Sequence, residues 1–383
     1  EKYKNWVLDY FDAWQERTLA NNGIVPDNIG LSGQIGEYMD GKWWGGYYGW
    51  RWPHGGTVLL EALTVAGQNA MLLTGDDRML DMARSQLDHL WELRQKIDGE
   101  WQIPHRYNDS GWNNFRPMSP ELPVQLWCMS GSASDADRIL RIGNPDRLNH
   151  AFSARGGGGN AGWFRFVNGN APDYPEHILQ TSYNAVSQAL DEIRDDDVAP
   201  DKLYIQHWIS RNPVICNALL QLTTGTPNPI YHGGLVQSRL RYFDVDQKRP
   251  GLPPNVAALI DQIEFENHPQ ESFRLQLVNL SPIHNQSLYL QTGTFGQHNL
   301  RRVETEGEAH TMEGKWLRAS LPPATSIEMR LTIDRFVNQP SYDTPIKSRT
   351  EGQSIIKVRN PDVDPGSISF RWEPDHPIKE EEK

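Results

Sequence analysis

Residues 57–97 read TVLLEALTVAGQNAMLLTGDDRMLDMARSQLDHLWELRQKI. The first part of this stretch, residues 57–73, is apolar on nearly every side, which predicts a buried helix. The Gly-Asp-Asp sequence at 75–77 predicts a turn, and residues 78–97 then carry their apolar side chains along one stripe. A buried helix, a tight turn and an amphipathic helix together predict an αα-hairpin.

Further helices are predicted on both sides of this hairpin. Residues 3–20 place an apolar face at helical spacing, and the same pattern predicts helices over 175–194 and 202–222. That face consists of Tyr3, Trp6, Val7, Tyr10 and Trp14. With about six long helices, or three hairpins, the pattern favours a closed or curved α/α array.

From about residue 263 the hydrophobic period changes to two, which is typical of strands. Alternating segments with Pro and Gly between them predict a small antiparallel β-sandwich. The strands are expected at 272–278, 287–292, 316–321 and 326–331. The Pro-rich stretch 249–254 is the predicted linker, so we expect a helical domain over 1–254, a β-sandwich over 255–345 and an extended C-terminal tail over 346–383.

The composition narrows the function classes. The 383 residues carry 37 basic and 49 acidic side chains, a net charge of −12, without the basic stripe that a nucleic-acid-binding surface requires. The 14 Trp and 13 Tyr are more aromatic side chains than a disordered chain carries. The sequence contains no run of about 18 apolar residues, so we expect no membrane span. We therefore expect no nucleic-acid partner and no membrane partner. Because the chain has only two Cys and no cofactor-binding motif, we also expect no metal and no cofactor.

The tryptophan is concentrated in one segment. Residues 43–52 read WWGGYYGWRW, and their aromatics follow neither the helical nor the strand period. Flat aromatic faces on a Gly-rich loop suit stacking on sugar rings, although the same side chains could instead plug the helical array. The candidate sugar-binding residues are Trp43, Trp44, Tyr47, Tyr48, Trp50, Arg51, Trp52 and His54.

Carboxylates accompany this segment. Asp27 and Asp40 lie close to it in sequence, and Asp109 follows the second helix of the hairpin. Glycoside hydrolysis needs two carboxylates across a sugar-binding cleft, one as acid and one as nucleophile or base. We therefore consider these three aspartates as catalytic candidates; the alternative for each is a cap or a turn.

A second cluster, PHRYND at residues 104–109, allows a different reaction. His105 and Tyr107 could act as base and acid in β-elimination, with Arg106 or Asn108 neutralising a uronate carboxylate. Trp112 adds a further sugar-binding candidate. The alternatives to a hydrolase are therefore a lyase acting on a uronate-containing glycan, and a glycan-binding protein without catalytic activity.

Helical hairpins, aromatic loops and a following β-sandwich resemble the six-hairpin (α/α) toroid carbohydrate-active enzymes, which include glycoside hydrolases and polysaccharide lyases. The resemblance implies a toroid fold, an oligo- or polysaccharide substrate and no cofactor. Because about three hairpins cannot close a six-hairpin ring, it also implies an upstream segment or a second chain that completes the ring. The sequence does not decide the compartment, but glycan degradation favours a periplasmic or secreted protein.

Overall fold

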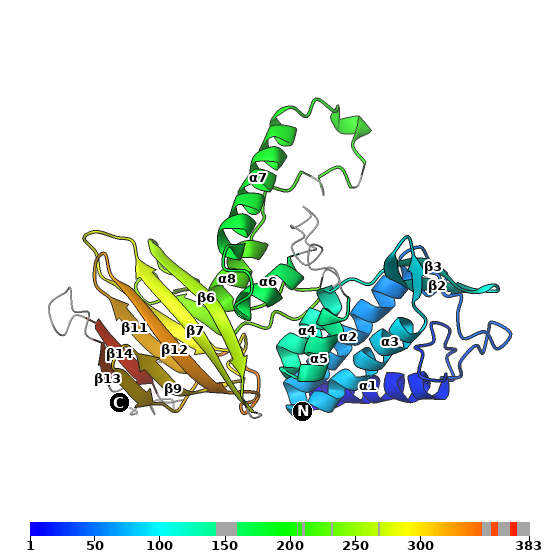
Figure 1. Cartoon of the computed structure of the whole chain (residues 1–383), viewed down its shortest axis with the longest axis horizontal. Coiled ribbons are helices and arrows are strands. Elements are labelled where there is room, and N and C mark those ends of the chain that lie inside the picture. Colours follow the sequence, from blue (N-terminus) through cyan, green and yellow to red (C-terminus); the bar gives the residue numbers. More distant parts are fainter. Residues whose placement is uncertain are drawn as a thin grey trace, which may run out of the picture. The chain divides into compact units, whose positions relative to one another are not determined.

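The computed structural model describes residues 1–142, 159–204, 206–208, 211–230, 233–266 and 269–346, with the backbones of two strands at 354–358 and 368–373. The chain divides into two compact units (Figure 1). Unit 1 comprises residues 1–149 and 229–235, and unit 2 comprises residues 150–228 and 236–383. This division differs from the predicted boundary at residue 254.

Unit 1 contains five α-helices, one 3-10 helix and a three-stranded antiparallel sheet among its described residues. In chain order the elements are α1 (Lys2–Ala20), α2 (Gly55–Thr74), η1 (Asp77–Leu80), α3 (Asp81–Glu92), β1 (Gln95–Ile97), β2 (Glu100–Asn108), β3 (Gly111–Pro117), α4 (Glu121–Ser130) and α5 (Ala133–Leu140). The helices predicted over 3–20 and 57–73 are therefore confirmed.

Helix α2 is the central helix of unit 1. It packs against α1, α3, α4 and β2, and it buries Leu60, Leu63 and Met71. By length and composition alone, α2 is also apolar enough to cross a membrane, which the sequence analysis did not anticipate. A core helix meets the same criterion, and the packing of α2 on four neighbours is that of a core helix.

The aromatic face of α1 is not a core face. Phe11 and Thr18 are buried on α1, whereas Tyr3, Trp6 and Tyr10 are exposed by 78%, 68% and 58%. Helical spacing predicts which side chains share a face of the helix. It does not predict whether the face with Phe11 or the face with Tyr3, Trp6 and Tyr10 packs against the rest of the unit.

The second helix of the predicted hairpin ends earlier than expected. Helix α3 stops at Glu92, and β1 and β2 follow as a hairpin in which Ile97 pairs with Glu100. Asp98 and Gly99 form the connecting turn with φ of +51° and +84°, which is the positive-φ pattern of a two-residue hairpin turn. Strand β2 then pairs with β3, so the PHRYND cluster of residues 104–109 lies on β2 and in the turn that follows it.

Unit 2 contains three α-helices, a 3-10 helix and two antiparallel sheets among its described residues. Its helices are α6 (Asn160–Val167), α7 (Tyr174–Arg194), η3 (Pro200–Lys202) and α8 (Asn217–Thr224). Its strands are β4 (Leu240–Asp244), β5 (Arg249–Pro250), β6 (Val256–Phe265), β7 (Gln270–Asn279), β8 (Gln286–Thr292), β9 (Asn299–Thr305), β10 (Glu308–Thr311), β11 (Trp316–Leu321), β12 (Ser326–Asp334), β13 (Ser354–Val358) and β14 (Ile368–Glu373).

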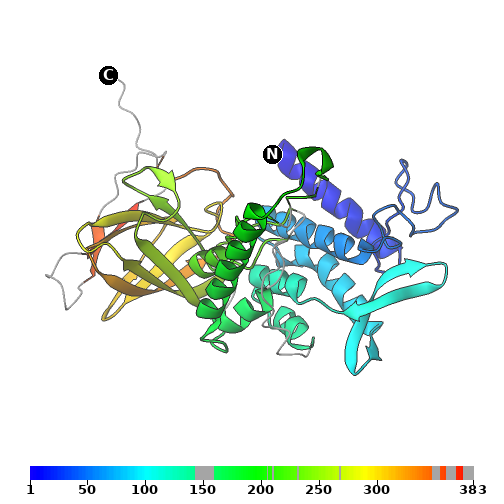
Figure 2. The same cartoon turned by 90° about the horizontal axis from the view of Figure 1, so that it is seen from above.

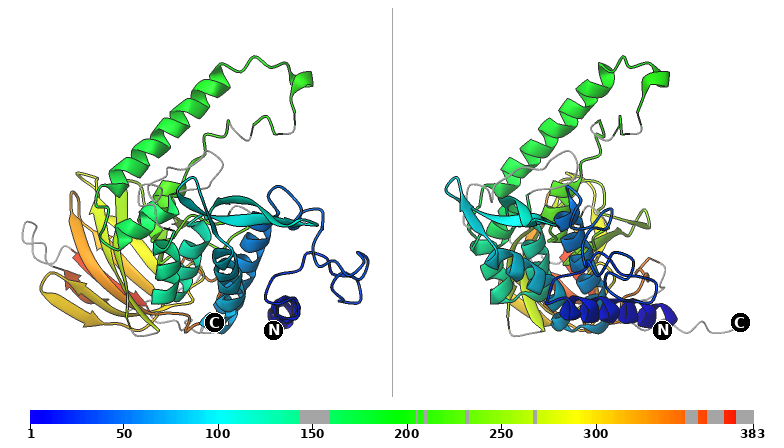
Figure 3. Two further views of the ribbon diagram at one scale, coloured as in Figure 1. Left: turned by 45° about the vertical axis from the view of Figure 1, so that its right-hand side comes forward. Right: turned by 90° about the vertical axis from the view of Figure 1, so that its right-hand side faces the viewer.

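The two sheets of unit 2 lie face to face (Figure 2). Their strand orders are β10-β9-β12-β7-β6 and β13-β14-β11-β8-β4-β5. Alternate residues of β12, among them Met329 and Leu331, are buried, as the period of two predicts. Helices α6 and α8 pack on β6, and α7 projects from the sheets (Figure 3). Most of residues 346–383, predicted as a tail, lie outside the described residues, although β13 and β14 belong to the six-stranded sheet.

The prediction of an (α/α) toroid is wrong. The described helices do not continue as hairpins, because a sheet follows α3 and two sheets make up most of the C-terminal half. The helix predicted over 202–222 also fails, since among the described residues of that range only those from Asn217 onward, in α8, form an α-helix. Pro213 lacks a backbone N–H and disfavours helical geometry at Asn212, so a helix cannot run through this point without a break.

Candidate functional site

The aromatic segment 43–52, called here the aromatic loop, belongs to the long connection between α1 and α2 in unit 1. Residues 21–54 contain no helix and no strand, apart from an isolated bridge between Ile29 and Ile35. The backbone N–H and C=O groups of such a segment need hydrogen-bond partners other than those that a helix or a sheet supplies. Side chains from its first residues supply several of those partners.

Asp27 is the main anchor of the aromatic loop. Its Oδ1 accepts a hydrogen bond from the Gly46 N–H at 2.9 Å, and its Oδ2 accepts one from the Trp50 N–H. A Cβ at Gly49 would lie only 1.9 Å from Asp27 Oδ2, so the carboxylate fills a space that glycine leaves open. Burial raises the pKa of Asp27, while the N–H groups of Gly46 and Trp50 act in the opposite direction. Both carboxylate oxygens are thus engaged with the loop backbone.

Five aromatic side chains form an inner cluster, which we define as Trp43, Trp44, Trp50, Tyr107 and Trp112. Trp50 is fully buried and donates from Nε1 to the Val25 carbonyl oxygen at 2.8 Å. The ring centroids of Trp43 and Tyr107 are 4.7 Å apart, and those of Trp50 and Trp112 are 5.1 Å apart. The inner cluster therefore joins the aromatic loop to the β2–β3 hairpin, with Trp44 and Trp50 buried and the other three rings half-buried.

Three other aromatics of the same loop form an outer triad, defined as Tyr47, Tyr48 and Trp52. Their ring centroids are 4.7 Å (Tyr47–Tyr48), 5.1 Å (Tyr47–Trp52) and 5.4 Å (Tyr48–Trp52) apart. Tyr47 is 72% exposed and Tyr48 is 63% exposed, whereas Trp50 is buried. Arg51 and His54, which flank Trp52, are exposed as well. The outer triad is thus a solvent-facing group of mutually supporting rings.

A salt bridge brings Asp109 to the aromatic loop. Asp109 lies at the turn of the β2–β3 hairpin, and its Oδ1 is 3.1 Å from the Nζ of Lys42. The Lys42 ammonium also lies 5.1 Å from the ring centroid of Trp44. Asp40, two residues before Lys42, is exposed and has a φ of +52°. Asp109 therefore lies beside the start of the aromatic loop, whereas both carboxylate oxygens of Asp27 accept hydrogen bonds from the loop backbone.

His105 lies inside rather than at the surface of the hairpin. Its Nε2 is buried without a hydrogen-bond partner, and its carbonyl oxygen lies against Gly56 of α2. Burial, together with the charge of Arg116, lowers the pKa of His105 to about 4, so the imidazole is neutral at pH 7. Asn108 accepts a bond from the Ser110 N–H in the hairpin turn. Arg106 donates from Nε to the Trp52 carbonyl oxygen at 3.2 Å.

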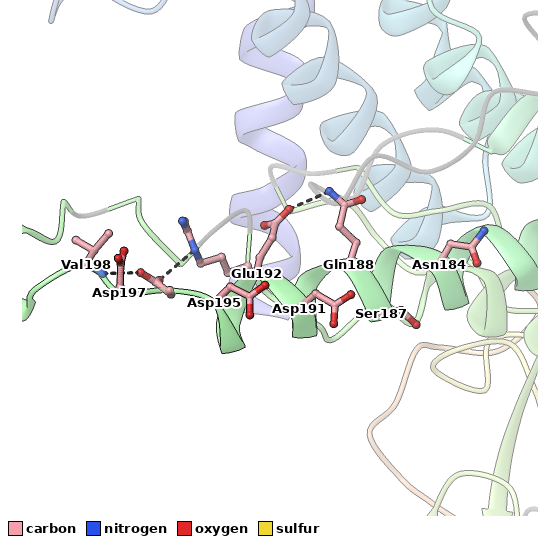
Figure 4. Close-up of a pocket in the computed structure, with 10 residues that line it drawn as sticks. Asn184, Ser187, Gln188, Asp191, Glu192, Asp195, Asp197 and Val198 are labelled. Carbon is pink, nitrogen blue, oxygen red and sulfur yellow. Dashed lines mark hydrogen bonds and ion pairs between the residues drawn. The ribbon is translucent and has the colours of Figure 1, made fainter.

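Unit 2 has a polar depression of about 610 Å³ beside the C-terminal end of α7 (Figure 4). It is lined by Asn184, Ser187, Gln188, Asp191, Glu192, Asp195, Asp196, Asp197, Val198 and Arg211. Asp196 is bonded to the buried His207 and to Arg211, and the hydrogen bond from His207 holds the pKa of Asp196 below its usual value. Within the described residues, no group of three or more His, Cys, Asp or Glu side chains is arranged to hold a metal ion.

Comparison with known families assigns the N-terminal part of the chain. The family model described as a domain of unknown function, DUF8034, matches residues 1–103 and 94–220, which together make up more than half of the 383 residues. The chain therefore belongs to this family. No curated protein matches it. The aromatic loop, Asp27 and the β2–β3 hairpin all lie within the matched residues.

We predict that Asp27→Asn releases the aromatic loop. The substitution replaces one acceptor oxygen with an NH₂ group that faces a backbone N–H. The lost hydrogen bond should lower the stability of the anchored loop by about 2 kcal/mol. Trypsin should then cleave after Lys42 and Arg51 faster than in the parent protein, as followed by mass spectrometry of the fragments. Asp40→Asn, at an exposed aspartate of the same segment, should leave the rate unchanged. Equal cleavage of all three proteins would contradict the anchoring role.

We predict that buried His105 makes the protein sensitive to mild acid. The unfolded imidazole takes up a proton below its ordinary pKa of 6.5, while the folded one does so only near pH 4. The free energy of unfolding should therefore fall by up to about 3 kcal/mol as the pH falls from 6.5 to 4. Urea titrations at the two pH values should show a smaller fall for His105→Asn. His54→Asn, at an exposed histidine, should behave like the parent, and identical falls in all three proteins would refute the assignment.

Proposed function

We propose that this protein is a carbohydrate-active enzyme and that the outer triad is where it binds its glycan. The observation that carries the proposal is the exposure of Tyr47 and Tyr48, which pack with the half-buried Trp52 on an anchored loop. Single exposed aromatic rings are common, but aromatic rings gathered into one exposed group often mark a binding site. Sugar rings present apolar C–H faces that stack on such rings, while their hydroxyls bond to neighbouring polar groups.

Within that class, the carboxylates favour glycoside hydrolysis. Asp109 forms an ion pair with Lys42, which suits the role of base or nucleophile. Asp40 forms no ion pair with a cation among the described residues, which suits the role of acid. These two residues are our candidates for base and acid. Asp27 is instead assigned to positioning, because both its oxygens bind the loop backbone. The substrate would lie along the outer triad between the aromatic loop and the hairpin turn.

The lyase alternative receives less support. Its proposed base, His105, has a buried Nε2, and its proposed acid, Tyr107, is packed among Trp43, Trp44 and Trp112. Proton transfer requires the acid or base to come within hydrogen-bond reach of the substrate. Neither side chain meets that requirement as well as the exposed carboxylates do.

We predict that the outer triad determines glycan binding. Tyr48→Ala and Trp52→Ala each remove a stacking surface worth about 1 kcal/mol or more, so binding should weaken roughly fivefold to tenfold. The measurement is retardation in native gels that contain one polysaccharide each, across a panel of plant, algal and animal glycans. Tyr183→Ala, which removes a tyrosine exposed by 68% on α7 of unit 2, is the matched control. Unchanged retardation of both triad variants would contradict the proposal.

We predict that the two carboxylates are needed for cleavage but not for binding. Asp40→Asn and Asp109→Asn should each lower the release of new reducing ends at least about 100-fold, the usual contribution of an acid or base. Both variants should still be retarded in the glycan gels. Asp98→Asn, in the exposed turn between β1 and β2, should cleave like the parent. Parent-like cleavage by both variants, or the absorbance of an unsaturated uronate product, would rule out this hydrolase assignment.

A further inference from the structure

Two arginines flank the outer triad without a carboxylate partner. Arg106 donates from Nε to the carbonyl oxygen of Trp52, which fixes the start of its guanidinium group and leaves both Nη atoms for another acceptor. Arg51 precedes Trp52 and is exposed. Neither arginine is bonded to an acidic side chain among the described residues. Four other arginines of unit 1, at residues 78, 84, 138 and 141, each pair with an aspartate, whereas Arg17, Arg94 and Arg116 form no ion pair with an acidic side chain of the described residues.

Three carboxylates of the same region are bonded elsewhere, and the exposed Asp40 forms no ion pair among the described residues. Asp27 binds the backbone of the aromatic loop, Asp109 binds Lys42, and Glu37 accepts bonds from the N–H and hydroxyl of Ser32. The two arginines therefore place uncompensated positive charge beside Trp52.

Helix α2 contributes to the same positive potential. It begins at Gly55, three residues after Trp52, without a side-chain cap and without an acidic residue in its first turn. The N-terminal end of a helix carries a partial positive charge, which here is not offset locally. The helix end only adds to the field of Arg51 and Arg106, which are the groups able to bond directly to a ligand.

We propose that the glycan bound at the outer triad is anionic, and that Arg106 and Arg51 bind its carboxylate or sulfate groups. This inference rests on the proposed glycan binding. Stacking on Tyr47, Tyr48 and Trp52 holds the sugar ring, and the guanidinium groups select rings that carry an oxyanion. Arginine suits this role because its planar donor groups bind oxyanions in pairs. Carboxylate and sulfate share this chemistry, so the test must separate uronates from sulfated sugars.

The experiment measures retardation of the full chain in native gels containing polygalacturonate, its highly methyl-esterified form, dextran sulfate or unmodified dextran. Each charged polymer thus has a partner with the same sugar backbone and little or no charge. We expect retardation by polygalacturonate or by dextran sulfate, at least about tenfold weaker affinity for the uncharged partner, and weakening with added salt. Retardation by only one charged polymer identifies uronate or sulfate as the group recognised.

Variants assign the effect to the two arginines. Arg106→Gln and Arg51→Gln should each weaken binding of the charged polymer about tenfold, while Arg106→Lys should retain part of it because the charge remains. Arg194→Gln changes the net charge equally in unit 2 and should bind like the parent. Unchanged melting temperatures show that the variants fold, and Arg51→Gln replaces an exposed side chain and so tests the inference even if Arg106→Gln unfolds.

The outcomes separate this inference from the proposed function. Equal binding to charged and uncharged partners, lost on Trp52→Ala but not on Arg106→Gln or Arg51→Gln, would overturn the anionic ligand and leave glycan binding in place. Binding to a charged polymer that neither arginine variant weakens would also overturn the assignment. No retardation by any polymer in this set or in the wider panel would overturn both proposals.

Discussion

The site depends on one constraint, which is that the Asp27 carboxylate accepts hydrogen bonds from the backbone N–H groups of Gly46 and Trp50. The aromatic loop has no ladder of its own, so the loop would otherwise leave these donors to water. Asn28 adds a second bond of this type, from its side-chain amide to the Trp44 carbonyl oxygen. Two adjacent polar side chains thereby hold a loop that could not keep its aromatics in place by packing alone.

That constraint sorts the aromatic side chains into two groups. The hydrogen bond from the Trp50 N–H places the Trp50 indole in the interior. There its Nε1 donates a hydrogen bond to the Val25 carbonyl oxygen, and its ring packs against Trp112 of the β2–β3 hairpin. The intervening residues must then return to the surface, which places Tyr47 and Tyr48 in water. The inner rings stabilise the loop, and the outer rings are left exposed at a cost that a ligand would recover. The same ten residues thus supply both a core and a candidate binding surface.

Parts of this arrangement could be predicted from the sequence. Period and length were enough for α1, α2 and α7 and for the strands β7, β8, β11 and β12, because their patterns are long and regular. The Gly-rich aromatic run predicted the loop. The pattern could not show which aromatics are buried, because burial in an irregular loop depends on individual bonds such as those of Asp27. The toroid prediction failed partly because the helix was predicted to continue to residue 97, whereas α3 ends at Glu92 and residues 95–97 form β1 before the Asp98-Gly99 hairpin turn.

The β2–β3 hairpin also bears on the choice between the two proposed reactions. Along a strand, successive side chains lie on opposite faces, so His105 and Tyr107 share one face of β2 and Arg106 and Asn108 share the other. A lyase site built from all four would need its acid and base on one face of the strand and its carboxylate-binding groups on the other. The structure assigns the first face to packing, through Tyr107 and the inner cluster, and leaves Arg106 beside Trp52. The alternation along β2 thus places Arg106, the proposed anion-binding residue, on the opposite face of the strand from the His105 imidazole.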